Sequence, residues 1–283
     1  MSPLSSAAER PAGPVDLTDA RAPRVKRVRA LAGRSVRGRQ AKFLIEGPQS
    51  VRAVLTHQPG IVVQVFHTPQ AAERHPDIAE RARQVAARST TTASEQVLHA
   101  MSPDAQGVLV VARIEPVPVE EALEGPLVAF LHQVRDPGNA GTVIRAADAA
   151  GAGGVVLSEA SVELHNPKTV RSSAGSMFHL PVATGADLTG TIERARNAGM
   201  QVLAADGEGQ VELDDLADAA GTGDLSRPTL WVFGNEAHGL TARERAMADA
   251  VVRIGIRGHA ESLNLAMAAT LCLFASARAQ RHR

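Results

Sequence analysis

The chain has 283 residues, 44% of them hydrophobic, and its 30 basic and 30 acidic residues give a formal net charge of zero. This length suits one large domain or two ordinary ones. No stretch approaches the roughly 20 uninterrupted apolar residues of a membrane span, and the first residues lack the apolar centre of a signal peptide, so we expect a cytoplasmic protein. A single cysteine, Cys272, and scattered histidines exclude a disulfide framework and argue against a metal site.

The first part of the chain is predicted to hold a disordered tail and a small α/β unit. Residues 1–22, rich in Ser, Ala and Pro, are typical of a disordered tail. Alternating strand and helix patterns then indicate a domain over residues 23–114. The predicted strands cover 42–47, 61–68 and 107–114, and helices are expected from about 24, from Pro48 and over 76–88.

A cluster of basic residues stands at the start of this unit. Nine Lys or Arg residues and no acidic residue occur from Arg21 to Lys42. Such a run is either a solvated arm or a surface that binds phosphate. Because the chain has six Phe, one Trp and no Tyr, RNA contacts would be mainly to phosphate and sugar. The candidate RNA-binding residues are Arg24, Lys26, Arg27, Arg29, Arg34, Arg37 and Arg39.

Residues 115–125, which contain prolines and glutamates, are predicted to be a linker to a second α/β domain over 126–283. Apolar strands alternate with helices there, which indicates a parallel sheet covered on both faces, with ligands at the carboxyl ends of its strands. The predicted strands are 127–134, 154–159, 201–206 and 229–236, and the predicted helices are 139–152, 191–200 and 262–281.

The stretch NAGTVIR contains an arginine within a helix that is otherwise made of small and apolar residues. Asn139 is placed to cap this helix, and steps of three give a polar stripe of Thr142, Arg145 and Asp148. Arg145 and Asp148 could form a surface ion pair. Alternatively, the stripe lines a cleft where the guanidinium holds a phosphate.

Two further stretches combine glycines with polar residues. FGNEAHGL (233–240) follows a strand, and Gly234 and Gly239 allow the backbone to approach a ligand closely. The stretch lacks the patterns of dinucleotide-binding and P-loop folds, and His238 is expected to be a turn residue rather than a base. In RIGIRGHAESLNLAMAA (253–269), Ser262 and Asn264 open the last helix, either as caps or as ligands at its N-terminus.

Taken together, NxGxxxR (139–145), GNExxGL (234–240) and SLNLAxA (262–268) resemble the three motifs of the SpoU family of RNA ribose 2′-O-methyltransferases. The resemblance implies a C-terminal α/β domain with a trefoil knot, a ribosomal-protein-like N-terminal substrate-binding domain, and S-adenosylmethionine as cofactor. By the same resemblance the backbone of Gly234, Ile254 and Leu263 holds the cofactor, and Ile256 lies near its adenine. It also implies a homodimer, for which the last helix offers Leu271, Leu273 and Phe274.

Within this resemblance Arg145 is the main catalytic candidate. Because the pKa of an arginine is about 12, its side chain stays protonated at neutral pH. We therefore expect Arg145 to bind the phosphate beside the target ribose and to lower the pKa of the 2′-hydroxyl. Phosphate or water then takes the proton. Asn139, Glu236, Ser262 and Asn264 are expected to orient the arginine and the ribose. Two positions depart from the usual pattern, Ala237 and Ala266, and both remain small.

Three functions fit these residues. The first is a ribose methyltransferase acting on ribosomal RNA, which the separate N-terminal domain favours. The second is the same reaction on transfer RNA. The third is a non-catalytic RNA-binding or ribosome-assembly protein with the same fold, against which the intact motif residues argue.

Overall fold

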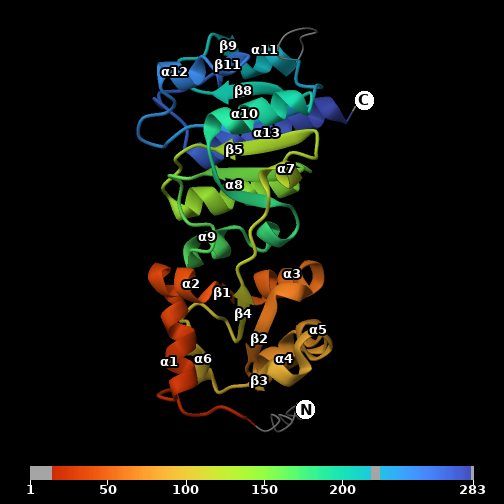
Figure 1. Cartoon of the computed structure of the whole chain (residues 1–283), viewed down its shortest axis with the longest axis vertical. Helices are drawn as coiled ribbons and strands as arrows, with labels where there is room; N and C mark the ends of the chain where they lie inside the picture. Colours follow the sequence, from red (N-terminus) through yellow and green to blue (C-terminus); the bar gives the residue numbers. More distant parts are fainter. Residues whose placement is uncertain (1–14, 218–223, 282–283) are drawn as a thin grey trace, which may run out of the picture.

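The computed structural model describes residues 15–217 and 224–281. They form two α/β units stacked along the long axis of the molecule, one built on a four-stranded sheet and one on a seven-stranded sheet (Figure 1). The predicted fold class, α/β with a parallel sheet in the C-terminal part and a smaller α/β part before it, is confirmed.

The N-terminal sheet has the order β1-β4-β2-β3, and β4 is antiparallel to both of its neighbours. Its strands are β1 (Lys42–Glu46), β2 (Val62–His67), β3 (Thr90–Thr92) and β4 (Val108–Arg113). Its helices are α1 (Pro23–Arg29), α2 (Arg34–Gln40), α3 (Pro48–His57), α4 (Pro69–Arg74), α5 (Pro76–Ala86) and α6 (Glu95–Met101). Four of these helices begin with proline, whose fixed φ suits the first helical turn.

The end of the predicted disordered tail is ordered. The carbonyl of Thr92 accepts hydrogen bonds from the backbone N–H groups of Asp16 (2.9 Å) and Leu17 (3.1 Å), and Leu17 forms a bridge with Ala93. The prediction of a disordered tail is therefore wrong for Asp16 and Leu17, which pair with the edge of the sheet beside β3. Residues 1–14 lie outside the described part of the chain.

The C-terminal sheet has the order β7-β6-β5-β10-β8-β11-β9, and every neighbouring pair is parallel. Its strands are β5 (Leu127–Leu131), β6 (Gly154–Ser158), β7 (Val182–Ala186), β8 (Gln201–Ala205), β9 (Val211–Glu212), β10 (Thr229–Phe233) and β11 (Ala250–Arg253). The carboxyl ends of these strands therefore meet at one edge, where open parallel sheets bind ligands.

Helices cover both faces of this sheet. The helices of this unit are α8 (Pro137–Ala149), α9 (Pro167–Ser172), α10 (Leu188–Asn197), α11 (Leu213–Ala217), α12 (Ala242–Arg245) and α13 (Leu265–Gln280), of which α9 packs on α8. Successive residues of β5 face opposite sides. Ala129 packs in one cluster with α8 and α13, and Phe130 in another with α10. This burial on both faces explains why the predicted strands are continuously apolar.

The predicted linker contains a short helix, α7 (Val119–Ala122). Ala122 is fully buried, and its carbonyl lies so close to Gly154 at the start of β6 that a side chain there would collide with it. The second half of the linker is therefore packed against the C-terminal unit. The limits given above for the domains stay predictions.

The last helix closes the core of the C-terminal unit. Trp231 on β10 is fully buried and donates a hydrogen bond from Nε1 to Oγ of Ser276 on α13, at 2.9 Å. Cys272 on the same helix is also fully buried, and this burial raises the pKa of its thiol. Cys272 thus behaves as the small core residue that its apolar surroundings in the sequence predict.

Candidate active site

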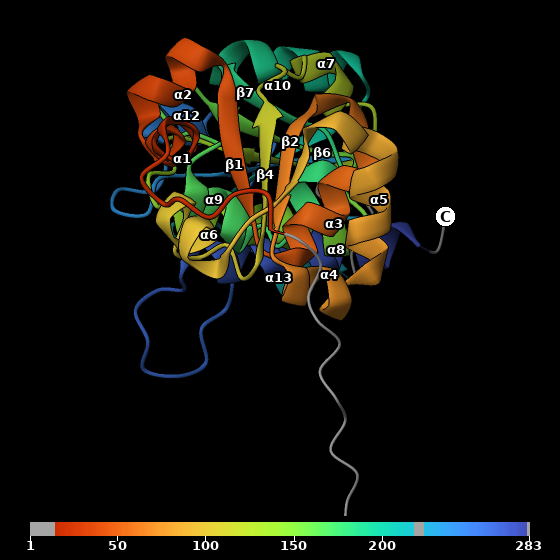
Figure 2. The same cartoon turned by 90° about the horizontal axis from the view of Figure 1, so that it is seen from below.

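A pocket of about 490 Å³ lies at the carboxyl edge of the seven-stranded sheet. Its walls come from the ends of β8 and β10, from the turn at 234–239 and from the loop between β11 and α13. Figure 2 shows this last loop projecting from the body of the molecule. The residues expected to bind the cofactor, Gly234, Ile254, Ile256 and Leu263, all line this pocket.

A chain of hydrogen bonds joins the three sequence motifs at this pocket. Nδ2 of Asn264 donates to Oδ1 of Asn139 at 3.0 Å, and Nδ2 of Asn139 donates to Oε1 of Glu236 at 3.2 Å. The carboxylate of Glu236 also accepts the backbone N–H groups of Arg135 and Asp136, both at 3.2 Å. The structure thus places three of the five predicted catalytic residues in one connected network.

These hydrogen bonds keep Glu236 ionised. Burial on its own would raise the pKa of Glu236. The backbone N–H groups of Glu236 and Arg135, the side chain of Asn139 and the backbone of Asp136 all favour the carboxylate and outweigh burial, so that the pKa lies below its usual value. At neutral pH Glu236 is an acceptor, and it holds both the start of α8 and the side chain of Asn139.

The two helix starts differ in how they use asparagine. Oδ1 of Asp136 accepts from the backbone N–H of Asn139 at 2.8 Å, so Asp136 caps α8 and the prediction that Asn139 does so is wrong. Because Asn139 lies within the first turn of α8, its side chain is available to the network. Asn264 does cap α13, accepting from Ala266 N–H at 2.9 Å. Ser262 lies in the exposed loop before α13, where it lines the pocket.

The turn after β10 is too tight for side chains at its two glycines. A Cβ on Gly234 would overlap the backbone of Gly239, and Gly239 has a φ of +62°. Asn235 and Gly239 exchange backbone hydrogen bonds of 2.9 and 3.2 Å across the turn. His238 is exposed within it, as expected of a turn residue. This closed turn presents backbone to the pocket, which suits a ligand held by main-chain groups.

Arg145 is exposed on α8 and is not among the residues that line the pocket of its own chain. The alternative ion pair with Asp148 is not formed, since Oδ2 of Asp148 pairs instead with Nδ1 of His179, at 2.8 Å. Within the described part of the chain, the guanidinium of Arg145 has no hydrogen bond or ion pair. The pocket of a single chain is therefore formed without Arg145, and the catalytic role of this residue stays a prediction.

The basic cluster divides into buried and exposed residues. Arg37 is 2% exposed, and its guanidinium is engaged by Glu163 and by the carbonyls of Leu31 and Ala32, so its assignment as an RNA-binding residue is wrong. Arg24 is partly buried over the ring of Phe66. The remaining candidates, Lys26, Arg27, Arg29, Arg34 and Arg39, are exposed on α1 and α2.

Sequence reasoning missed three charged residues beside the turn. Oδ2 of Asp206 accepts from the backbone N–H of Leu240 at 3.2 Å, and Nη1 of Arg245 donates to the carbonyl of Leu240 at 2.6 Å. Arg245 also binds Glu208, at 2.5 Å. Asp206 directly follows β8, so an acidic residue at the carboxyl end of a predicted strand was the signal that could have found it.

Two further searches of the described residues concern metals and membranes. No group of three or more His, Cys, Asp or Glu side chains in the ranges 15–217 and 224–281 could hold a metal ion. No helix in those ranges is long and apolar enough to cross a membrane.

Fold and site together define a SPOUT-type methyltransferase, whose cofactor is S-adenosylmethionine. Residues 126–274 match the model of the SpoU rRNA methylase family, and residues 22–112 match an MRM3-like substrate-binding domain. This chain belongs to the SpoU rRNA methylase family.

Known relatives are similar over most of the chain. A 23S rRNA uridine 2′-O-methyltransferase of Streptomyces viridochromogenes is 30% identical over 88% of this chain and 86% of its own. RlmP of Bacillus subtilis, a 23S rRNA guanosine 2′-O-methyltransferase, is 29% identical over 89% and 94%. An AdoMet-bound rRNA methyltransferase structure from Sinorhizobium meliloti has a TM-score of 0.77 and 30% identity, covering 93% of this chain and 97% of that one.

Proposed function

We propose that this protein transfers the methyl group of S-adenosylmethionine to a ribose 2′-hydroxyl of ribosomal RNA. The observation that supports this most directly is the Asn264–Asn139–Glu236 network at the mouth of a glycine-walled pocket. The cofactor supplies an electrophilic methyl group. The hydroxyl oxygen forms a bond to that carbon, the carbon–sulfur bond breaks with its electron pair staying on sulfur, and the hydroxyl proton leaves to phosphate or water.

The pocket residues fit this cofactor. The pocket has a volume of about 490 Å³, which falls in the usual range for small-molecule sites. Gly234 and Gly239 leave no room for side chains and expose backbone groups, while Ile254, Ile256 and Leu263 offer apolar surface for an adenine ring. We assign cofactor binding to Gly234, Ile254, Ile256 and Leu263.

The polar residues hold and orient the ribose. Asn139, Glu236 and Asn264 are fixed to one another, so they provide positioned donors and acceptors before the substrate arrives. Ser262 lines the same pocket from the loop before α13. Arg145 is assigned to the phosphate next to the target ribose, where its charge stabilises the developing alkoxide. None of these residues is assigned the proton.

The exposed face of α13 supports a homodimer. Met267, Leu271 and Phe274 are 62%, 47% and 43% exposed at positions i, i+4 and i+7 of α13, so they form one apolar stripe. Leu273, also expected at the interface, is fully buried in the core of its own chain because it points to the opposite side of the helix. Since α13 packs against α8, a second chain on this stripe would lie beside the helix that carries Arg145.

We further propose that the exposed cations of α1 and α2 bind the phosphates of the RNA, and that the protein acts in the cytoplasm. The relatives act on 23S rRNA according to their names, which favours ribosomal RNA over transfer RNA. The N-terminal match to a substrate-binding domain agrees with this choice.

A methyl-transfer assay tests the proposed function. Purified protein is incubated with S-adenosylmethionine labelled in its methyl group and with either unmodified ribosomal RNA or unmodified transfer RNA, and the labelled ribose is then mapped. We expect label at one ribose of ribosomal RNA. Label only in transfer RNA would establish the second function, and measurable cofactor binding with no transfer to either RNA would favour the non-catalytic protein.

A further inference from the structure

The segment 163–180 lies between the two α/β units and touches both. It contains α9 and a short 3-10 turn at Ser176–Phe178. In Figure 1, α9 stands directly between α8 of the C-terminal unit and α2 and β1 of the N-terminal unit. We call residues 163–180 the bridge segment.

Ion pairs of Glu163 and of Arg171 fix the bridge segment to the N-terminal unit. Nε and Nη2 of Arg37 donate to the two carboxylate oxygens of Glu163, both at 2.7 Å, in the paired geometry that makes arginine–carboxylate contacts strong. Nη1 of Arg171 lies 3.0 Å from Oε2 of Glu46, whose side chain is 4% exposed, and 3.0 Å from Oδ2 of Asp104. Charges buried this deeply are tolerated only when they are fully partnered.

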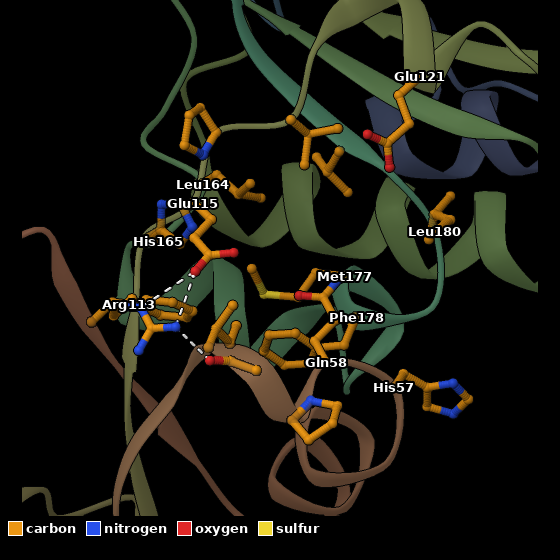
Figure 3. Close-up of a pocket in the computed structure, with 17 residues that line it drawn as sticks. His57, Gln58, Arg113, Glu115, Glu121, Leu164, His165, Met177, Phe178 and Leu180 are labelled. Carbon is orange, nitrogen blue, oxygen red and sulfur yellow. Dashed lines mark hydrogen bonds and ion pairs between the residues drawn. The ribbon is translucent and has the colours of Figure 1, made fainter.

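Apolar and backbone contacts complete the interface between the bridge segment and the N-terminal unit, which we call the seam. The rings of Phe43 and His165 lie 4.4 Å apart, and Gly175, with a φ of +94°, packs so closely on α3 that a side chain there would collide with Ala53. A pocket of about 420 Å³ runs along the seam, with Gln58 from one unit and Met177 from the other among its lining residues (Figure 3). One continuous hydrophobic cluster includes buried residues of both units. The two units are therefore packed together at several points.

The other side of the bridge segment holds the start of α8. Nζ of Lys168 donates to Oδ2 of Asp136, the cap of α8, at 3.0 Å. Oγ of Ser172 donates to the carbonyl of Pro137 at 3.1 Å. A Cβ on Gly141 would overlap Ser172 and the backbone of α9, so the two helices are in close contact. The six-residue helix α9 thus contacts the substrate-binding domain on one side. On the other side it contacts the first turns of α8, the helix that carries the first sequence motif.

We propose that the bridge segment sets a fixed distance between the RNA-binding helices and the catalytic pocket, and that Glu163, Arg37, Arg171 and Glu46 are positioning residues that determine which ribose is methylated. This inference rests on the proposed function. It applies to structured RNA that contacts both units at once. In such a substrate the distance between the RNA-binding helices and the catalytic pocket decides which ribose reaches the pocket. A short oligonucleotide that occupies the pocket alone gains nothing from the bridge.

Two variants weaken the seam and leave the residues that line the catalytic pocket unchanged. In Glu46→Gln/Arg171→Gln an amide pair, which can still form a hydrogen bond, replaces the ion pair between these residues, and the ion pair between Arg171 and Asp104 is lost. Glu163→Gln removes the charge that faces Arg37. The matched control is Arg52→Gln, which breaks the exposed ion pair between Arg52 and Asp77 within the N-terminal unit. Circular dichroism shows whether each variant is folded, and the double variant stands in if Glu163→Gln is not.

The first readout is activity on two substrates, a transcript of the ribosomal RNA domain that contains the mapped ribose and a short oligonucleotide around it. We expect both seam variants to lose about ten- to a hundredfold in kcat/KM on the transcript, or to methylate neighbouring riboses, with little change on the oligonucleotide. Cofactor Kd should stay unchanged. Equal loss on both substrates, or no loss with methylation at the original ribose, would overturn the proposal.

The second readout does not depend on activity. Dyes are attached to cysteines introduced at the exposed residues Glu80 and Glu193, one in each unit, because native Cys272 is buried and unreactive. Energy transfer should report one narrow distance in the parent and in Arg52→Gln, and a broad one in the seam variants. An equally narrow distance in the seam variants refutes the bridge, whereas a parent that transfers no methyl group refutes the proposed function and leaves this measurement valid.

Discussion

Arg37 and Arg145 carry the same guanidinium in opposite surroundings. Arg37 is buried and three of its side-chain nitrogens donate within the protein. Arg145 is exposed, and its guanidinium has no ion pair or hydrogen bond among the residues that the structure describes. Sequence reasoning placed both at functional positions. Burial separates them, because a buried arginine must be satisfied internally, while an exposed one remains available for a ligand or a partner.

Replacement of Arg145 with alanine tests its assignment. We expect Arg145→Ala to abolish methyl transfer while the Kd for S-adenosylmethionine changes only a few-fold, about 1 kcal/mol, because the side chain lies outside the cofactor pocket. The free energy of unfolding should stay within about 0.5 kcal/mol of the parent, as for most surface substitutions. Thr142→Ala, on the same exposed stripe, is the control. A large loss of cofactor binding in Arg145→Ala would show that the assignment is wrong.

His165 makes the seam sensitive to acid. Burial lowers the pKa of His165 from its ordinary 6.5 to about 4, with the charge of Glu163 opposing the change and that of Arg37 adding to it. As the pH falls below 6.5 the unfolded chain binds this proton first, so stability is lost between pH 6.5 and pH 4. At pH 5 the loss from this group is about 2 kcal/mol.

Urea unfolding at neutral pH and at about pH 5 measures this effect. His165→Phe keeps a ring against Phe43 and removes the titrating group, so its free energy of unfolding should fall less between the two pH values than that of the parent. His238→Gln, at an exposed position, should retain the full dependence. An identical pH dependence in His165→Phe and the parent would exclude His165 as the source.

At the scale of elements, α1 and α2 present a row of exposed cations. We expect Lys26→Gln/Arg27→Gln/Arg29→Gln/Arg39→Gln to weaken RNA binding and to reduce the slope of log Kd against log salt, by about 0.7 to 0.9 for each phosphate that the variant no longer neutralises. Arg37 is left unchanged, because its removal would leave Glu163 without its main partner. Arg81→Gln/Arg83→Gln on α5, also exposed, is the control. A slope equal to that of the parent would show that these helices touch no phosphate.

The strands that sequence reasoning found and missed differ in burial. β5, β6, β8 and β10 are almost entirely buried, and their apolar runs were predicted. β7 contains exposed Thr184 and Gly185, β9 has two residues, and β11 is mostly half-buried. These strands carry no continuous apolar pattern, so only pairing with a neighbouring strand reveals them.

The site itself was largely visible in the sequence, since three short motifs meet in one network. The hydrogen-bond partner of each group was not visible. The cap of α8 was assigned to Asn139, but the true cap is Asp136, three residues earlier, and both residue types favour that position. Asp206 and Arg245 lie far apart in the chain and meet beside Leu240.

At the scale of the whole molecule, the exposed stripe of α13 governs the proposed assembly. Phe274→Glu places a charge in the apolar stripe, so we expect the dimer to dissociate and methyl transfer to fall sharply, while the monomer keeps its fold and its cofactor pocket. Sedimentation velocity measures whether the variant is a monomer or a dimer. The methyl-transfer assay measures the effect of dissociation on activity. Gln84→Glu, on the exposed side of α5, should leave both unchanged. A parent chain that sediments as a monomer would contradict the proposed homodimer.

The relation between the two units also belongs to this scale. Prolines and glutamates predicted a linker between the domains, yet half of it is packed, and the bridge segment joins the units through partly buried ion pairs. No local pattern in residues 163–180 indicates this, because each of these contacts joins residues that are about 125 positions apart.

Trp231 gives the molecule a built-in optical signal. The chain has one tryptophan and no tyrosine, so excitation at the long-wavelength edge of aromatic absorption reaches a single indole. That indole is enclosed between β10 and α13 and bonded to Ser276. Its emission maximum should therefore stay at short wavelength while the last helix remains packed on the sheet, and shift to longer wavelength when that helix detaches. Intrinsic fluorescence thus reports one defined event rather than an average over the protein.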